Sequence, residues 1–220
     1  MRQKETNMTN TTNASFTHLE TMNVLTSTLP NDLFQEITGD IADLSKDSEP
    51  YNDRLIGHIQ EEYSLDHSIE KVSSFVTALA NAWSESNPGY INGTQDNQQE
   101  FYIEGMWVNK QRKYEFNPIH NHSGDLSFVI WMNIPYNLAD EENYFPLVSK
   151  GQTSYTSKFC FVYTDTLGKI KQLPVPVDKS FEGTIVMFPA SLHHTVYPFY
   201  TSDDYRISIS GNIKRKDLIK

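Results

Sequence analysis

The segment NPIHNHSGDLSFVIWMNIP, residues 117–135, joins a polar loop to a long apolar run. The run from Leu126 to Pro135 is rich in β-branched and aromatic residues, which is typical of a buried β-strand. His120 and His122 stand directly before it, and residues at i and i+2 share one face when the backbone is extended. The segment therefore predicts a buried strand with two imidazoles just before its start.

From residue 100 onward the chain contains short runs patterned with a period of two, and turn material such as NHSGD and TSDD separates these runs. We expect strands in the runs FYIEGMWVNKQ (101–111), KYEF (113–116), LSFVIWMNIP (126–135), SKFCFVYTD (157–165), IKQLPVPV (170–177), GTIVMFP (183–189), HTVYPFY (194–200) and YRISISGNI (205–213). Many short strands without βαβ alternation predict a sandwich or barrel. Neither GxGxxG nor a P-loop signature is present, which argues against a nucleotide-dependent enzyme.

The part before residue 99 has helical periodicity instead. LPNDLFQEITGDIADLSKD (29–47) and SLDHSIEKVSSFVTALANAWSES (64–86) each carry an apolar stripe at helical spacing, and residues 51–63 carry a weaker one. We expect a disordered N-terminus over 1–15, a helical part over 16–98, a β core over 99–214 and a basic tail over 215–220. The stripe in 65–83 must be buried, so the helical part is expected to pack on the β core. Alternatively, the helical part closes over the substrate as a lid or forms a homodimer interface.

Composition limits the partners of this 220-residue chain. Asp and Glu total 28 against 18 Lys and Arg, a net charge of −10, which argues against nucleic-acid binding. Cys160 stands alone in an apolar run and is expected in the core. The N-terminus has no apolar signal region and no window is long enough to cross a membrane, so a cytoplasmic protein without membrane contact is expected.

Two later segments, GTIVMFPASLHHTVYPF (183–199) and DDYRISISGNI (203–213), supply a third histidine and an arginine. On a strand His194 shares its face with Val196 and Pro198, which leaves His193 pointing outward. Arg206, Ser208 and Ser210 share one face of the next strand. That face is either exposed to solvent or binds an anion. The second alternative is possible because arginine binds carboxylates bidentately. Its place after His194 favours the anion.

Imidazole suits Fe, Zn and Cu, and three protein ligands leave positions open for substrate and O₂. The expected metal ligands are His120 and His194 together with His122, or with Asp125 if a loop turns that carboxylate inward. Trp131 and Asn133, on the strand after the histidine pair, and Tyr163 are expected to line the pocket.

These three segments together resemble the iron(II)/2-oxoglutarate-dependent oxygenases, in particular a compact phage and bacterial branch with a His-x-His start. The resemblance covers roughly residues 100–213 and rests on order and spacing. It implies a double-stranded β-helix, a jelly-roll or cupin-like barrel, preceded by helices. It also implies His194 as the distal metal ligand, Arg206 as the partner of the 2-oxoglutarate C5 carboxylate and Ser208 as its helper. The wider superfamily has a carboxylate where this chain has His122.

The resemblance implies Fe(II) as metal, 2-oxoglutarate and O₂ as cosubstrates, and hydroxylation of a primary substrate coupled to oxidative decarboxylation of 2-oxoglutarate. The related enzymes act on proline and other protein residues, nucleobases and small metabolites. Two other functions compete with this one. A cupin-type dioxygenase with three histidines needs no 2-oxoglutarate, and a phage or bacterial binding module on the same fold needs no metal.

Overall fold

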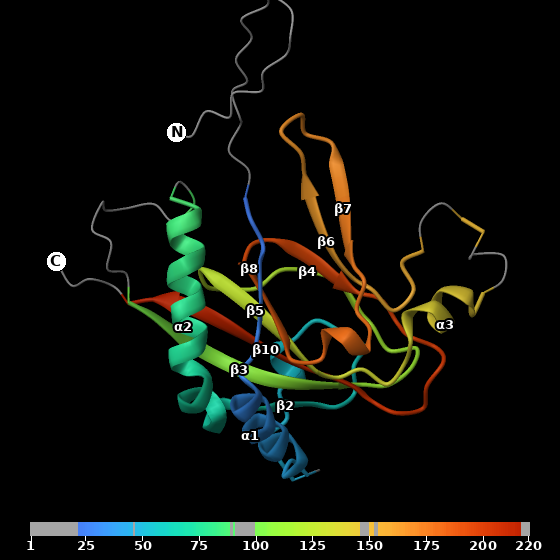
Figure 1. The fold of residues 1–220 in the computed structure, drawn as a ribbon, viewed down its shortest axis with the longest axis horizontal. Coiled ribbons are helices and arrows are strands. Elements are labelled where there is room, and N and C mark those ends of the chain that lie inside the picture. Colours follow the sequence, from blue (N-terminus) through green and yellow to red (C-terminus); the bar gives the residue numbers. More distant parts are fainter. Residues whose placement is uncertain are drawn as a thin grey trace, which may run out of the picture.

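The computed structural model describes residues 22–45, 47–88, 90, 100–145, 150–151 and 154–216 (Figure 1). The strands are β1 (Leu25–Thr28), β2 (Glu62–Ser64), β3 (Phe101–Gln111), β4 (Asn117–His120), β5 (Leu126–Asn133), β6 (Phe159–Thr164), β7 (Ile170–Val175), β8 (Thr184–Pro189), β9 (His193–Val196) and β10 (Arg206–Arg215). The α-helices are α1 (Asn31–Ala42), α2 (Ile69–Ser86) and α3 (Leu138–Asn143), and short 3₁₀ turns occupy Asn52–Arg54, Asp66–Ser68 and Lys179–Phe181. A mainly β protein with helices near its N-terminus is thus confirmed.

The strands form two antiparallel sheets. The larger has the order β1-β8-β5-β10-β3-β2 and the smaller has the order β4-β9-β6-β7. From β3 to β10 the chain passes repeatedly between the two sheets, so strands that follow one another in sequence mostly face each other in space. β10 is central because it pairs with β5 on one side and β3 on the other.

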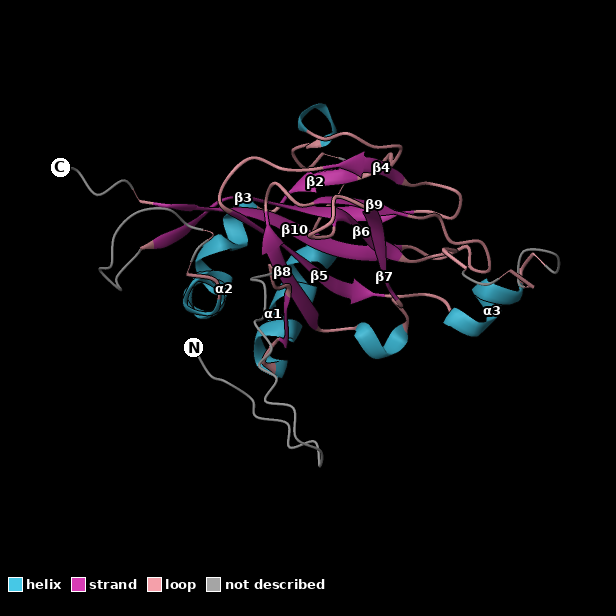
Figure 2. Ribbon diagram, turned by 90° about the horizontal axis from the view of Figure 1, so that it is seen from above, coloured by secondary structure: helices cyan, strands magenta, loops and turns pink. Residues whose placement is uncertain are grey.

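Helix α2 covers the outer face of the larger sheet (Figure 2). Its buried residues Val72, Val76, Ala80 and Trp83 recur at helical spacing, so they form one stripe toward the sheet. Met106, Phe128 and Ile209 of the sheet belong to the same apolar cluster. Burial of this stripe accounts for the position of the helix, because its apolar side chains would otherwise face water.

A second apolar cluster lies between the two sheets. It includes Val129 and Trp131 of β5, Phe159 and Phe161 of β6, and Phe188 of β8. Val129 and Trp131 alternate along β5 with residues of the first cluster, so both faces of this strand are buried. Cys160 is buried as expected, and burial raises the pKa of its thiol to about 11.

Several local expectations were wrong. Residues 51–63, expected as a weak helix, form a 3₁₀ turn and then β2, which pairs with β3. The run KYEF, expected as a strand, is a turn in which Tyr114 has φ 71°, and strand β4 starts only at Asn117. Strand β1 was not expected and adds to the edge of the larger sheet beside β8. The expected disordered segment 1–15 lies outside the described residues.

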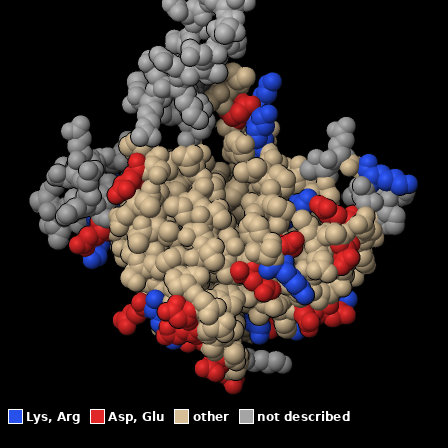
Figure 3. All heavy atoms as spheres, in the orientation of Figure 1, with Lys and Arg blue, Asp and Glu red and all other residues tan. Residues whose placement is uncertain are grey.

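The basic cluster expected in the tail is partly structured, because β10 extends to Arg215. Lys214 pairs with Glu104, Arg215 with Asp125 at 3.0 Å, and Lys216 with Glu100 at 2.6 Å. On the face in Figure 3, Lys and Arg side chains are scattered among Asp and Glu rather than gathered in one patch. Within the described ranges, no helix is long and apolar enough to cross a membrane.

Candidate metal centre

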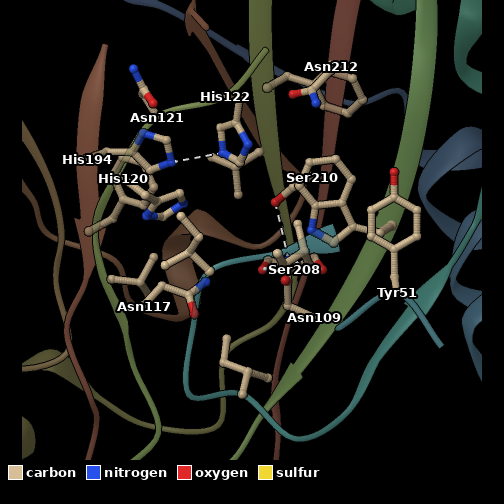
Figure 4. A pocket seen from close by; sticks show the side chains of 18 of the residues that line it. Tyr51, Asn109, Asn117, His120, Asn121, His122, His194, Ser208, Ser210 and Asn212 are labelled. Atoms are coloured by element: carbon tan, nitrogen blue, oxygen red, sulfur yellow. Dashed lines mark hydrogen bonds between the residues drawn. The ribbon is translucent and has the colours of Figure 1, made fainter. Parts of the chain in front are cut away.

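Three histidines converge at one end of the space between the sheets (Figure 4). His120 ends β4 and lies directly opposite His194 of β9. His122 follows in the next loop, where its backbone N–H donates to the Ala190 carbonyl at 2.8 Å. One ring nitrogen from each histidine lies within 4.8 Å of the others, and the Nε2 atoms of His122 and His194 are 3.2 Å apart.

The backbone fixes which nitrogen faces the centre. The Nδ1 atom of His120 lies 2.7 Å from the Pro118 carbonyl, and Nδ1 of His194 lies 3.0 Å from the Leu192 carbonyl. Because a carbonyl only accepts, each Nδ1 carries the proton and each Nε2 keeps a free lone pair. Histidine ligands of metals are commonly oriented by such a bond on the other nitrogen.

Burial keeps all three rings neutral at pH 7. It lowers the pKa of His122 to about 4, that of His194 well below its ordinary value, and that of His120 as well. The rings of Phe159, Phe161 and Phe188 surround His194. Protons therefore do not compete for these nitrogens at neutral pH.

The spacing fits a transition metal. Two nitrogen ligands at about 2.1 Å from an ion and at right angles to each other lie roughly 3 Å apart, close to the observed separation of His122 and His194. In the described part of the chain this trio is the group with metal-ligand spacing. Three neutral imidazoles suit iron, zinc or copper and leave further coordination positions open.

Asp125, the alternative third ligand, lies elsewhere. Gly124, at φ +103°, turns the chain before it, and the Asp125 carboxylate accepts from the backbone N–H of Arg215 at 2.9 Å and from its Nε at 3.1 Å. The carboxylate is thus engaged at the end of β10, and the structure brings His122 to the centre instead.

A cavity of about 460 Å³ extends from the histidines between the sheets. One wall is polar: Asn109 of β3 donates to the hydroxyls of Ser208 and Ser210 at 3.3 and 3.2 Å. Tyr51, which stacks on Trp107 with ring centroids 5.2 Å apart, closes another side. Arg54, Leu55, Ile56 and Ile59 also line the cavity, so a loop of the N-terminal part helps to enclose the site.

Arg206 also lines the cavity, and only 3% of its surface is exposed. Its five N–H groups all donate: Nε and Nη2 to Gln111 Oε1, Nη1 to the Tyr136 hydroxyl and the Ser157 carbonyl, and Nη2 to the Tyr197 carbonyl. Each acceptor is neutral. A buried cation without a paired anion is costly, so the cavity beside Arg206 is suited to an anionic ligand.

Residues 105–212, which contain the three histidines and Arg206, match the model of a family described as "Putative 2OG-Fe(II) oxygenase". The chain belongs to the 2OG-Fe(II) oxygenases. Iron(II) and 2-oxoglutarate are accordingly its cofactors. The donors present fit both groups, because three neutral imidazoles can hold the ion and a buried guanidinium can face a carboxylate.

Solved structures that share the fold of this oxygenase include the following two. A prolyl-4-hydroxylase from Pseudomonas putida is 16% identical, with 89% of this chain and 94% of that chain covered and a TM-score of 0.52. HygX from Streptomyces hygroscopicus, solved with nickel and 2-oxoglutarate bound, is 9% identical, with 89% of this chain and 84% of that chain covered and a TM-score of 0.50. No sequence of a curated protein matches the chain.

Most residues expected at the oxygenase site do line its cavity: the three histidines, Trp131, Arg206 and Ser208. Asn133 does not. It is exposed and donates to the Tyr205 carbonyl at 2.7 Å, because the pairing of β5 with β10 shifts register beside it. Tyr163 lies exposed on β6 and His193 is exposed as predicted.

Sequence reasoning missed the contribution of β3. Asn109 and Gln111 line the cavity from this strand together with Trp107. Their alternation in FYIEGMWVNKQ was a usable signal, since polar residues two apart on a central strand share one face. Nothing in the sequence marked residues 51–59 as part of the site.

Proposed function

We propose that the chain is an Fe(II)- and 2-oxoglutarate-dependent dioxygenase that holds iron through His120, His122 and His194. The observation that carries this proposal is the convergence of three neutral imidazoles, two of them oriented by backbone carbonyls, on one cavity. When bound, iron with 2-oxoglutarate and O₂ supplies oxidative decarboxylation of the keto acid and the oxidation of a C–H bond. The protein contributes ligand geometry, an oriented cosubstrate and exclusion of water.

Arg206 is the proposed partner of the 2-oxoglutarate C5 carboxylate, and Ser208 donates a further hydrogen bond. No carboxylate pairs with Arg206 in the described ranges, and Ser208 lines the cavity two residues along the same strand. Trp131 stands opposite Ser208 in the sheet pairing and forms an apolar wall beside it. Asn133 is dropped from this set because its side chain points away from the cavity.

Charge balance favours this assignment. A ligand set of three neutral imidazoles leaves the full charge of a divalent ion uncompensated by protein. The 2-oxo acid end of 2-oxoglutarate would bring one carboxylate to that charge, and its second carboxylate would pair with the charge of Arg206. A cupin-type dioxygenase that uses no 2-oxoglutarate has no comparable need for a buried guanidinium.

We also propose that the fold is a double-stranded β-helix over residues 99–214, with residues 16–98 packed against it. The alternation of successive strands between the sheets from β3 to β10 supports this proposal, as does the position of the histidines at one end. The burial of α2 on the larger sheet supports the packing of the N-terminal part.

For the reaction we propose hydroxylation, with a protein side chain such as proline as the substrate to test first. Arg54, Leu55, Ile56 and Ile59 line the cavity together with Asn121 and Ser123 of the loop that bears the histidines, and we propose that an extended substrate enters between these two segments. The fold shared with a prolyl-4-hydroxylase motivates proline as the first choice.

The test is succinate formation from 2-oxoglutarate with Fe(II) and a panel of proline-containing peptides. We expect slow turnover without peptide, faster turnover with a substrate, and none with His194→Ala. His193→Ala, at the exposed neighbour, is the matched control and retains activity. Iron binding without any succinate would favour the three-histidine dioxygenase that needs no 2-oxoglutarate, and absence of iron binding would refute the site.

A further inference from the structure

Gln111 occupies the edge of Arg206 that a carboxylate would take. Its Oε1 accepts from Nε of Arg206 at 3.0 Å and from Nη2 at 2.6 Å. These two N–H groups form the parallel pair through which arginine binds carboxylates bidentately. One amide oxygen thus stands where two carboxylate oxygens would fit.

The other acceptors of Arg206 are less able to leave. Those of Ser157 and Tyr197 are backbone carbonyls, and Ser157 is itself held at φ 61° in a buried turn. The Tyr136 hydroxyl is buried and also donates to the Ser157 carbonyl at 3.2 Å. None of these three residues lines the cavity, whereas Gln111 does.

Gln111 can move because its second anchor is a single hydrogen bond, from its Nε2 to the Glu115 carbonyl at 2.6 Å. All five N–H groups of Arg206 are taken, so any carboxylate that contacts the guanidinium must displace an acceptor. A charged carboxylate forms stronger hydrogen bonds to arginine than a neutral amide does. Replacement of the Gln111 amide oxygen by a carboxylate is therefore favourable, and Gln111 is the acceptor that is displaced.

We propose that Gln111 is a positioning residue that holds Arg206 in the ligand-free enzyme. When the cosubstrate binds, its carboxylate displaces Gln111 from the Nε and Nη2 atoms of Arg206. This inference rests on the proposed function of Arg206. Gln111 then sets the affinity for 2-oxo acids that carry a second carboxylate and leaves the affinity for those that lack one unchanged. The residue selects the cosubstrate without touching the metal.

The experiment is anaerobic calorimetric titration of the Co(II)-loaded full-length protein with 2-oxoglutarate and, separately, with 2-oxobutyrate, which lacks the second carboxylate. Gln111→Met keeps the length of the side chain but removes the competing oxygen. We expect it to bind 2-oxoglutarate about three- to tenfold more tightly than the wild type and to bind 2-oxobutyrate with unchanged affinity. Equal melting temperatures for the metal-loaded proteins establish that the variant is folded.

Gln111→Glu is the second variant. It places a carboxylate permanently on Arg206, so we expect at least about thirtyfold weaker binding of 2-oxoglutarate, an unchanged affinity for Co(II) and an unchanged affinity for 2-oxobutyrate. Weaker 2-oxoglutarate binding by Gln111→Met, or equal effects on both keto acids, overturns the inference while the proposed function stands. Failure of the wild type to bind either keto acid overturns both.

Discussion

His194 shows at the scale of a residue how this chain prepares a metal ligand. Its ring is enclosed by phenylalanines, its Nδ1 faces the carbonyl of Leu192, and its Nε2 faces His122. Burial favours the neutral ring and the carbonyl fixes its tautomer, so the lone pair is in place before the ion arrives. The neighbouring His193 is exposed and has no such surroundings.

This contrast predicts the effect of single substitutions on metal binding. His194→Ala should weaken Co(II) binding by at least about a hundredfold, because one of three ligands is lost. His193→Ala and Asp125→Asn should leave it within twofold, since neither residue reaches the centre. Calorimetric titration of the metal-free proteins measures all three. A strong loss of Co(II) binding in Asp125→Asn would show instead that this carboxylate is a metal ligand.

Glu62, on β2, is a buried acid with 2% exposure, and its Oε1 has no hydrogen-bond partner. Burial, aided by repulsion from Glu115, raises its pKa to about 7. A raised carboxyl pKa means that the fold favours the protonated form. The contribution of Glu62 to the free energy of unfolding is therefore fully present below pH 4.5 and is lost as pH rises through 7.

Glu62→Gln should therefore be more stable than the wild type at pH 8, by roughly 3 kcal/mol for a shift of this size. The difference should vanish near pH 4. Denaturant unfolding at several pH values measures it. Parallel stability profiles of the two proteins would show that Glu62 titrates normally in the fold.

Strand β10 organises the site at the scale of an element. Arg206, Ser208, Ser210 and Asn212 line the cavity from one face, while Ile209 and Ile213 join the core under α2. Between these sets Gly211 lies opposite Phe128 of β5. A Cβ at Gly211 would lie 2.5 Å from the Phe128 ring and 3.0 Å from the Gly105 carbonyl oxygen, so the strands can approach only because this residue has no side chain.

Gly211→Ala should lower the free energy of unfolding by about 2 kcal/mol, because the phenylalanine must shift within a packed core. Gly39→Ala in α1 is the matched control: nothing lies within 4 Å of its added Cβ, and alanine should stabilise the helix by about 0.5–1 kcal/mol. Chemical denaturation measures both. Equal stability of Gly211→Ala and the wild type would contradict this packing.

The sequence predicted long apolar elements well and short polar ones poorly. The runs that became β5, β8 and β10 are strongly patterned, and tertiary contacts only reinforce them. KYEF and residues 51–63 carry weak patterns, so pairing partners elsewhere in the chain decide their structure. Asn133 failed as a site residue for the same reason, because a local shift in register cannot be read from alternation alone.

At the scale of the whole molecule, the larger sheet separates two apolar clusters with different roles. One, under α2, contains Val76 and lies on the side away from the histidines. The other, between the sheets, contains Phe159, whose ring centroid lies 5.2 Å from that of His194. Stability and metal binding should therefore respond differently to mutation in each cluster.

Val76→Ala should cost about 2 kcal/mol of stability and leave the affinity for Co(II) within twofold. Phe159→Leu should weaken that affinity about fivefold or more, because the ring that holds His194 away from water is replaced by a smaller side chain. Thermal unfolding and calorimetric titration measure the two quantities on each variant. Equal effects of both substitutions on metal binding would show that the sheet does not insulate the site.

The most direct measurement is an anaerobic titration of the metal-free protein with Fe(II) and then with 2-oxoglutarate, followed by visible absorption. Chelation of iron by a 2-oxo acid produces a metal-to-ligand charge-transfer band. We predict that the band requires both additions and is absent from His194→Ala. A protein that binds iron but shows no band when 2-oxoglutarate is added would contradict the account of this cavity as a cosubstrate site.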